Sequence, residues 1–490
     1  MASLVEFDRI EKKICEIFHV LELTDFQRKA IKSSMNGKDV LVVSKTGSGK
    51  SLIVEEVHAI DNRTKDAVVI VILPLLSIMV EQVEKLVGLG FAATYIGKDH
   101  AEDKAILSGQ FDFVYGSPEE LAGNGKWRDM MLAIRSRISF IVVDEVHTVV
   151  NWGESQGTEE PFRAWFSHIG ELRSLCPGTP LMAGTATASV EKRKKIMDSL
   201  YMSVLTTDVL VDSPDRPNIK LSVKCVKATH DLQDTFWWIV KHLSDTMPHY
   251  VIFCKTIKDC SLLYNTLKPK DNETTGLVQM YHSKTLHSIK DEIRTTLSNE
   301  SGKVRLLVCT NAAGMGVNFA AVNNVINYGP PQDMDTFIQQ IGRAGRDGTQ
   351  AQHLLVYHKH QMKNLEKPML AYVKNTEHCR RENLVESYGC KNNSKPVGHL
   401  CCNVCNEECD CGMEDCTELF NIELINMPPS DTFEEEEETT FRRSTEKQSD
   451  QLQDLLQQYQ KQLSTDSSGR LLANETVHGF LEQLVAQIVA

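Results

Sequence analysis

The sequence predicts an α/β protein with two tandem parallel-sheet domains, followed by a small helical metal-binding module and an acidic tail that we expect to be disordered. Short, continuously apolar β-branched runs alternate with helical patterns twice along the chain. This alternation is typical of parallel sheets that are covered by helices on both faces. Eight of the 14 cysteines lie between Cys379 and Cys416, which indicates the metal-binding module.

Two series of strands are expected. In the first domain they lie at 39–43, 67–73, 111–115, 140–144 and 181–183, with helices at 51–59 and 76–87. In the second they lie at 250–254, 277–282, 304–310, 324–328 and 353–357. Residues 212–218 between the two series are rich in turn-forming residues and read as a linker. The predicted boundaries are 1–210, 211–362, 363–416 and 417–490.

The negative charge of this chain is local. The net charge is −13, and residues 406–440 hold 13 acidic residues and no Lys or Arg. The other 53 acids balance the 53 bases, so a basic groove for nucleic acid remains compatible with the composition. No run of about 18 apolar residues occurs, so we expect no membrane partner. The first residues lack the apolar core of a signal peptide, which favours a reducing compartment. In such a compartment, clustered cysteines bind metal more often than they form disulfides.

A glycine-rich loop at 44–51 follows the first strand and precedes a helix. Glycines let backbone N–H groups approach phosphates, Lys50 supplies a positive charge to the β- and γ-phosphates, and Ser51 can bind Mg²⁺. Ser44 stands where the generic pattern has Gly. The residues expected to bind the nucleotide are Thr46, Gly47, Ser48, Gly49, Lys50 and Ser51.

Two further segments carry chemistry suited to phosphoryl transfer. Asp144 ends an apolar strand, where its carboxylate can hold Mg²⁺, and Glu145 can orient or deprotonate the attacking water. Arg343 and Arg346 each follow a glycine that allows two domains to close tightly, and we expect Arg346 to contact the γ-phosphate. The alternatives are two exposed acids in a loop and a pair of surface arginines.

These segments, in this order, resemble the superfamily 2 helicases, and within them the RecQ family of DNA helicases. Asp144-Glu145-Val146-His147 departs from the D-E-A-H box only at Val146. Matches to other family motifs occur at 73–83, 184–188, 213–218, 310–318 and 339–348. The last segment begins with Gln339 and matches Q-x-x-G-R-A-G-R-D-G, so the resemblance adds Gln339 to the catalytic residues.

The resemblance implies two RecA-like domains and ATP-dependent DNA unwinding with 3′→5′ movement. It implies ATP and Mg²⁺ as cofactors, single-stranded and forked DNA as partners, a role in DNA repair and recombination, and a nuclear location with the cytoplasm as the alternative. It also places Gln27 at the adenine edge. Val20 and Thr24 stand where the family often has an aromatic residue and an arginine.

The loop after the Asp144–His147 box resembles the family's aromatic-rich loop, which couples DNA binding to hydrolysis. The aromatic residues and arginine that we expect to contact DNA are Trp152, Phe162, Arg163 and Trp165. The alternative for the tryptophans is a place in the core.

The cysteine cluster predicts a structural Zn²⁺. The pair Cys402 and Cys405 can hold one side of a tetrahedral ion, with Cys379 as the third ligand. The fourth ligand is open among Cys401, His399 and Cys390, and we choose Cys401. Further cysteines, Cys409, Cys411 and Cys416, exceed one site and are alternative ligands, a second weak site or free thiols.

After Cys416 we find no pattern of the winged-helix domain that larger family members carry. Residues 451–463 have apolar residues at helical spacing and read as a helix for a protein partner or as a solvated helix. Two other functions compete with a DNA helicase. One is a nucleic-acid-binding scaffold with a vestigial motor, and the other is an RNA-directed motor, since backbone contacts dominate binding.

Overall fold

The computed structural model describes residues 4–45, 49–50, 53, 67–153, 163–227, 231–268, 276–297, 302–314, 322–390 and 395–412. The expected helix 51–59, apart from Ile53, lies outside these residues, as do the helix 451–463 and the acidic tail from residue 413 onward. Within the described part, no helix is long and apolar enough to cross a membrane.

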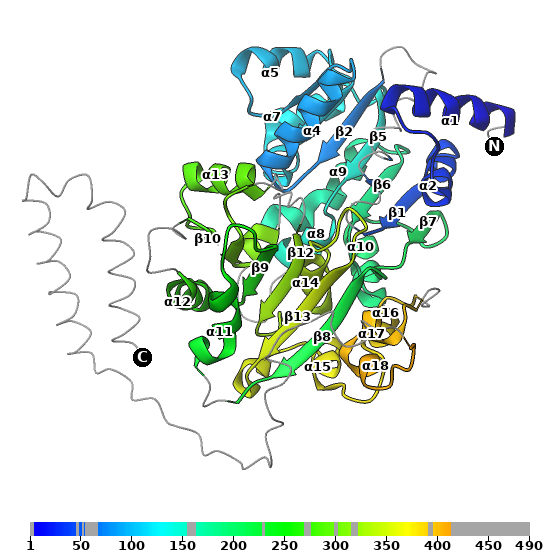
Figure 1. The fold of residues 1–490 in the computed structure, drawn as a ribbon. Coiled ribbons are helices and arrows are strands. Elements are labelled where there is room, and N and C mark those ends of the chain that lie inside the picture. The colour runs from blue at the N-terminus through cyan, green and yellow to red at the C-terminus, as the bar shows by residue number, and fades with distance from the viewer. Residues whose placement is uncertain are drawn as a thin grey trace, which may run out of the picture. The chain divides into compact units, whose positions relative to one another are not determined.

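The first sheet is entirely parallel. Among the described residues its seven strands follow the order β3-β4-β2-β5-β6-β1-β7 (Figure 1). Their bounds are β1 Asp39–Val43, β2 Val68–Ile72, β3 Ala93–Tyr95, β4 Phe113–Gly116, β5 Ile138–Val143, β6 Leu181–Thr185 and β7 Thr207–Val211. The helices are α1 Leu4–Phe18, α2 Asp25–Met35, α4 Leu76–Gly88, α5 His100–Leu107, α6 Pro118–Leu121, α7 Gly125–Ala133, α8 His147–Gly153, η1 Ala164–Glu171, α9 Leu172–Leu175 and α10 Val190–Ser199.

Alternate side chains of each strand in this sheet enter different cores. Val40 and Val42 of β1 pack with Met79 and Val83 of α4. Their neighbours on β1 belong to a second cluster, with the buried face of α7 and with α8, η1 and α10. Successive side chains of a strand point to opposite faces, so a strand that is apolar throughout must be covered on both. The strands read as continuous apolar runs in the sequence because helices cover both faces of the sheet.

The second sheet is also parallel. Its six strands within the described part follow the order β10-β11-β9-β12-β13-β8. Their bounds are β8 Ile219–Cys225, β9 His249–Cys254, β10 Val278–Tyr281, β11 Leu306–Cys309, β12 Val322–Tyr328 and β13 Ala351–Tyr357. The helices are α11 Leu232–His242, α12 Ile257–Leu267, α13 His287–Leu297, η2 Asn311–Gly314, α14 Met334–Ile341 and η3 Lys359–Met362.

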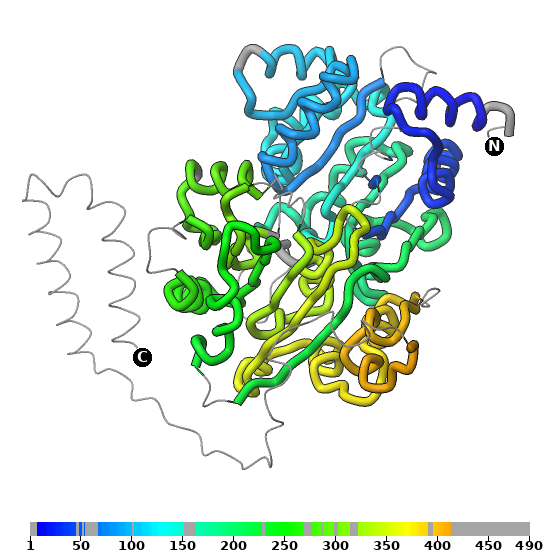
Figure 2. Tube along the Cα trace, viewed as in Figure 1, coloured from blue at the N-terminus to red at the C-terminus, as the bar shows by residue number. Residues whose placement is uncertain are grey.

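Four short helices follow the second sheet: α15 Lys367–Lys374, α16 Arg380–Glu386, α17 Gly398–Cys401 and α18 Asn403–Glu407. They form the predicted helical module, which lies against β8 (Figure 2). Tyr372, Leu384 and Cys402 belong to the same hydrophobic cluster as Leu221 of β8 and Phe337 of α14. The module and the second sheet therefore share one core.

The predicted fold class is confirmed, but three strands were missed. β3 is only three residues long, and β7 lies at the edge of its sheet and is largely half-exposed. β8 alternates apolar and polar residues and follows the linker directly. None of the three is the buried apolar run that identified the other strands. Residues 212–218, all described, contain no helix or strand, while the domain boundaries remain a prediction.

Candidate nucleotide site and metal centre

The predicted catalytic residues of the first domain meet at one edge of its sheet. β5, β6 and β1 are adjacent, so the residues that follow them lie together at the carboxyl ends of the strands. This edge is where parallel α/β sheets bind ligands. Lys50 comes from the loop after β1, Asp144 directly follows β5, and Thr185 ends β6.

The loop after β1 holds Lys50 inward. Its Nζ donates to the backbone oxygens of Ser44 at 2.6 Å and Lys45 at 3.3 Å. Burial lowers the pKa of Lys50, against the opposing charges of Glu145 and Asp144. Ser44, the departure from the generic pattern, donates its hydroxyl to Asp212 of the linker at 3.4 Å. The predicted ligands Thr46, Gly47, Ser48 and Ser51 lie outside the described residues.

Asp144 and Glu145 form a pair of acids beside Lys50. Burial and the neighbouring charge of Glu145 raise the pKa of Asp144 to about 6, and Lys50 opposes this rise. Glu145 has a φ of 50°, a left-handed conformation that a residue with a side chain adopts at a free-energy penalty and that clusters at functional sites. The donor set of two adjacent, partly buried carboxylates fits Mg²⁺, which prefers oxygen ligands.

Gln27 lies beside the phosphate loop. Its Nε2 donates to the backbone oxygen of Gly49 at 3.4 Å, while its Oε1 accepts from the backbone N–H of Thr24 at 2.8 Å. Gly49 has a φ of +78°, which favours glycine, and a Cβ there would lie 2.6 Å from Gln27 Nε2 and would make that side chain shift. Thr24, the second departure from the family pattern, caps α2. The role of Gln27 at adenine remains a prediction.

His147 connects three motifs, and the sequence reading gave it no role. Its Nδ1 lies 3.2 Å from Thr185 Oγ1, and its Nε2 lies 3.4 Å from Gln339 Nε2. Gln339 also donates to Thr187 Oγ1 at 3.4 Å. Burial lowers the pKa of His147 to about 4, so the ring is neutral at pH 7 and its Nε2 can accept from the Gln339 amide. Gln339 of the second sheet thereby contacts the acidic box of the first.

Arg343 and Arg346 follow α14, and they interact electrostatically with Glu145 and with Lys50, respectively. Burial and the like charge of Arg346 lower the pKa of Arg343 to about 9, and the charge of Glu145 opposes this. Arg346 in turn lowers the pKa of Lys50. The structure therefore brings Lys50, Asp144, Glu145, Gln339, Arg343 and Arg346 into one electrostatic neighbourhood, although the arginines and Lys50 come from different sheets.

The linker holds the arginine loop in place. Arg216 donates to the backbone oxygen of Gly345 at 2.5 Å and to that of Ala344 at 3.3 Å. Asn218 donates to the oxygens of Gly345 at 2.9 Å and Thr349 at 2.7 Å. A Cβ on Gly345 would lie 2.6 Å from Asn218 Nδ2. The sequence predicts only a linker for residues 212–218, and the match of 213–218 to the family motif is the signal that could have indicated this support.

A second support joins α10 to α14 and the module. Lys192 Nζ lies 2.7 Å from Asp335 Oδ2, and Tyr388 donates its hydroxyl to Asp335 Oδ1 at 2.7 Å. Arg193 donates to the backbone oxygen of Tyr388 at 3.2 Å. Asp335 is buried. These contacts fix the helix that carries Gln339 against the first domain.

The residues predicted to contact DNA are only partly described. Phe162 and the side chain of Trp152 lie outside the described residues, and Trp165 is 40% exposed. Arg163 donates two hydrogen bonds to Glu119, at 2.6 and 2.5 Å, and one to the backbone oxygen of Pro74 at 2.7 Å. Contact of Arg163 with a phosphate requires exchange of this ion pair, and the DNA-binding roles remain a prediction.

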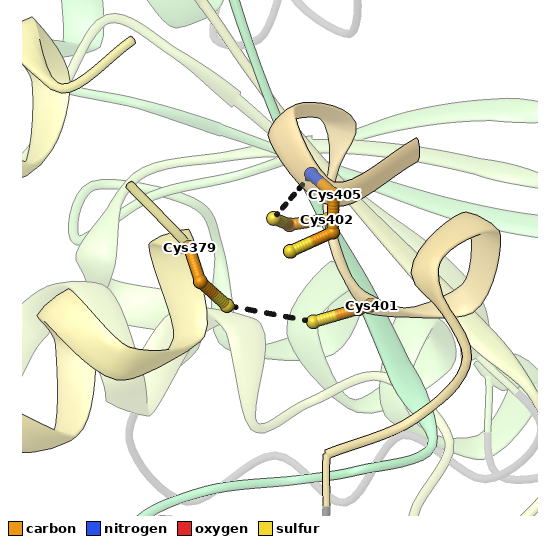
Figure 3. Close-up of side chains that lie close together, drawn as sticks. All are labelled: Cys379, Cys401, Cys402 and Cys405. Carbon is orange, nitrogen blue, oxygen red and sulfur yellow. Dashed lines mark hydrogen bonds between the residues drawn. The ribbon is translucent and has the colours of Figure 1, made fainter. Parts of the chain in front are cut away.

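Four cysteines of the module converge, as Figure 3 shows. The Sγ atoms of Cys379, Cys401, Cys402 and Cys405 lie within 4.8 Å of one another. Cys379 Sγ lies 3.6 Å from Cys401 Sγ, and the backbone N–H of Cys405 donates to Cys402 Sγ. Of the three residues considered for the fourth ligand, the structure brings Cys401 into this group. Four thiolates at this separation match the donor set of tetrahedral Zn²⁺.

Arg381 joins the helix that follows Cys379 to the linker. Its side chain is 1% exposed and forms an ion pair with Asp215. It also donates to the backbone oxygens of Arg216 at 2.9 Å and Ile219 at 2.6 Å. A buried arginine with this many acceptors fixes its surroundings, since loss of its partners would leave a buried charge.

Comparison with protein families matches both domains. Residues 24–196 match the DEAD/DEAH box helicase family, and residues 235–348 match the helicase conserved C-terminal domain. The RecQ protein of Haemophilus influenzae is 27% identical over 363 residues, which cover 73% of this chain and 54% of that protein. The Schizosaccharomyces pombe DNA helicase hus2/rqh1 is 28% identical over 84% of this chain and 32% of its own length. The chain is therefore similar to RecQ helicases, and it contains two regions that match helicase domain families.

Two further comparisons bear on substrate and fold. The Acanthamoeba polyphaga mimivirus protein R290, whose name proposes an ATP-dependent RNA helicase, is 27% identical over 87% of this chain and 79% of its own length. The structure of Mycobacterium smegmatis helicase Lhr bound to ssDNA and AMP-PNP covers 80% of this chain with a TM-score of 0.56 and 18% identity, which supports the fold. The chain spans about a third to a half of the length of the two cellular relatives.

Proposed function

We propose that this chain is an ATP-dependent DNA helicase that moves 3′→5′ on single-stranded DNA. The observation that carries the proposal is the meeting of Lys50, Asp144 and Glu145 with Gln339, Arg343 and Arg346 from the other sheet. A lysine and two acids on one side of a domain boundary, with a glutamine and two arginines on the other, are suited to a phosphoryl group and its metal between them. The RecQ-like comparisons support DNA as the track and 3′→5′ as the direction.

In this proposal each side chain has one task. ATP is the substrate, and Mg²⁺, when bound, neutralises charge on its phosphates. Lys50 binds the β- and γ-phosphates, Asp144 holds the metal, and Glu145 orients the attacking water. Arg346 stabilises negative charge that develops at the γ-phosphate, with Arg343 beside it. Because the two sets of residues come from different domains, domain closure completes the site and hydrolysis releases it.

The test is ATP turnover by the full chain without nucleic acid, with single-stranded DNA and with RNA of matched sequence. A DNA helicase gives a large stimulation by DNA and little by RNA. Forked duplexes with either a 3′ or a 5′ tail then report direction, and unwinding of only the 3′-tailed substrate is expected. Absence of any stimulated turnover would leave the scaffold alternative, in which the motor is vestigial.

An RNA-directed motor is the second candidate. The comparison that favours it is the mimivirus protein named above, of which this chain spans 79%. Contacts to the nucleic-acid backbone supply most of the affinity in either case. Equal or greater stimulation of ATP turnover by RNA in the same assay would favour this candidate over the DNA helicase.

Several further properties belong to the same proposal. Zn²⁺ in the four-cysteine centre holds the module on the second sheet, and its role is folding. The sequence prediction also gives domain boundaries at 210, 362 and 416, forked as well as single-stranded DNA as a partner, and a protein partner for the tail. A nuclear location, with the cytoplasm as the alternative, rests on the resemblance, and fluorescence microscopy of the tagged chain tests it.

A further inference from the structure

A second group of metal-binding side chains lies in the module: His399, Cys409 and Cys411. His399 Nδ1 lies 3.5 Å from Cys409 Sγ and 3.3 Å from Cys411 Sγ. The three ligand atoms lie within 4.8 Å of one another. Ligand atoms on a tetrahedral Zn²⁺ with ordinary Zn–S and Zn–N bond lengths lie about 3.5–3.8 Å apart. The observed distances are close to this spacing.

We propose that His399, Cys409 and Cys411 bind a second Zn²⁺. Two thiolates and an imidazole are soft and borderline donors that suit Zn²⁺ far better than Mg²⁺ or Ca²⁺. These residues supply three of the four ligands of a tetrahedral ion from the described part of the chain. The site shares no residue with the four-cysteine centre.

The two centres differ in burial. Cys379, Cys401 and Cys402 are buried within the core of the second sheet. Cys409 and Cys411 are only partly buried, and His399 is the one buried ligand of its group. An ion at the second site is therefore more accessible to chelators, and we expect it to exchange much faster than the ion in the four-cysteine centre.

Gly398 gives independent support for the close approach of Cys409. A Cβ at position 398 would lie 2.9 Å from Cys409 Cβ, 3.0 Å from its Sγ and 2.6 Å from the backbone oxygen of Cys405. A side chain there would therefore require the Cys405 backbone and Cys409 to shift. Residues 409–411 belong to no helix or strand. An ion at this site would hold this segment against α17 through its ligands, in place of apolar packing.

The experiment is a zinc count on the full chain. Protein purified under reducing conditions is equilibrated with a small excess of Zn²⁺, desalted, and measured by mass spectrometry of the metal. The wild type is expected to hold two ions per chain, and Cys409→Ser and Cys411→Ser one each. Cys225→Ser, which removes an exposed thiol outside both groups, is the matched control and should keep two.

Release kinetics separate the two sites. With EDTA and a colorimetric zinc indicator, one of two ions should leave the wild type at least tenfold faster than the other, and Cys409→Ser should lack the fast phase. Circular dichroism melts verify that the variants are folded. One ion in the wild type, two ions retained in Cys409→Ser, or a Cys409–Cys411 disulfide in the intact mass of zinc-equilibrated protein would each overturn the proposal.

Discussion

The two sheets contribute to one candidate site in different ways. The first sheet places Asp144 and Glu145 directly after β5, and Lys50 follows the loop that leaves β1. The second contributes Arg343 and Arg346 from a loop after α14, and that loop depends on donors from the linker and on a helix braced by the module. The acids that follow β5 are positioned by their own sheet, whereas the arginines are positioned by segments distant in sequence. Substitution of the catalytic residues should therefore remove a reacting group, whereas substitution of the supports should misplace one.

The largest effect is expected within the first sheet. Lys50→Ala removes the positive charge that binds the β- and γ-phosphates. It should lower DNA-stimulated ATP turnover at least about 100-fold. Glu145→Gln should bind ATP with near-normal affinity and hydrolyse it slowly, because only the carboxylate that orients water is lost. Lys38→Ala is the matched control, since Lys38 pairs with Asp208 at the surface. Near-normal ATP turnover in both Lys50→Ala and Glu145→Gln would contradict the proposal that the chain is an ATP-driven motor.

A smaller effect should follow from loosening the second sheet's loop. Arg216→Ala removes the donors to Ala344 and Gly345 and should lower kcat about 10–100-fold by misplacing the arginines, with little change in the KM for ATP. Arg137→Ala is the control, since Arg137 also donates to two backbone oxygens, those of Ser108 and Gly109. A rise in KM at constant kcat would mean that Arg216 acts on binding instead.

Removal of a ligand from the four-cysteine centre should damage the second sheet more than the first. Cys405→Ser is expected to reduce soluble yield, because metal affinity contributes to the folding free energy and the module shares its core with β8 and α14. Hydrogen exchange should show lost protection in β8 and α14 with β1 and β5 unchanged. Uniform loss across both sheets would contradict the separate roles.

The smallest effect concerns pH and one buried histidine. Burial lowers the pKa of His353 to about 3, and the ring bonds to Asn327 at 2.9 Å. Because the pKa is lowered in the folded state, the free energy of unfolding falls as the pH drops below 6.5, the ordinary pKa of histidine, toward 3. This histidine contributes at most about 1.4 kcal/mol of that loss per pH unit. Urea unfolding at pH 6.5 and 4.5 should give a smaller loss in His353→Gln than in wild type, and the surface variant His378→Gln should match wild type.

The sequence predicted the parts of this site that are local. The loop at 44–51 and the box at 144–147 are short segments next to apolar strands, so their chemistry and position can be read together. The supports could not be predicted in this way: Asn218 contacts Gly345 across 127 residues, and Arg193 contacts Tyr388 across 195. Such pairs have no periodicity or spacing that identifies them.

The cysteine module shows the same limit on a smaller scale. Spacing selected Cys402 and Cys405, and four cysteines now lie together, yet spacing left His399 as a rival ligand. The fold separates them, since His399 lies with Cys409 and Cys411 and Cys401 with the other group. The missed strands β3, β7 and β8 are short, at an edge or alternating, so no continuous apolar run marked them.

The most direct measurement is ATP hydrolysis by Arg346→Ala, with ATP affinity measured in parallel by a fluorescent analogue. If both sheets complete one site, this variant should bind the nucleotide with less than about tenfold loss and hydrolyse it about 10³-fold or more slowly in the presence of single-stranded DNA. Turnover within a few fold of wild type would contradict the account, because the second sheet would then contribute no charge to the reaction.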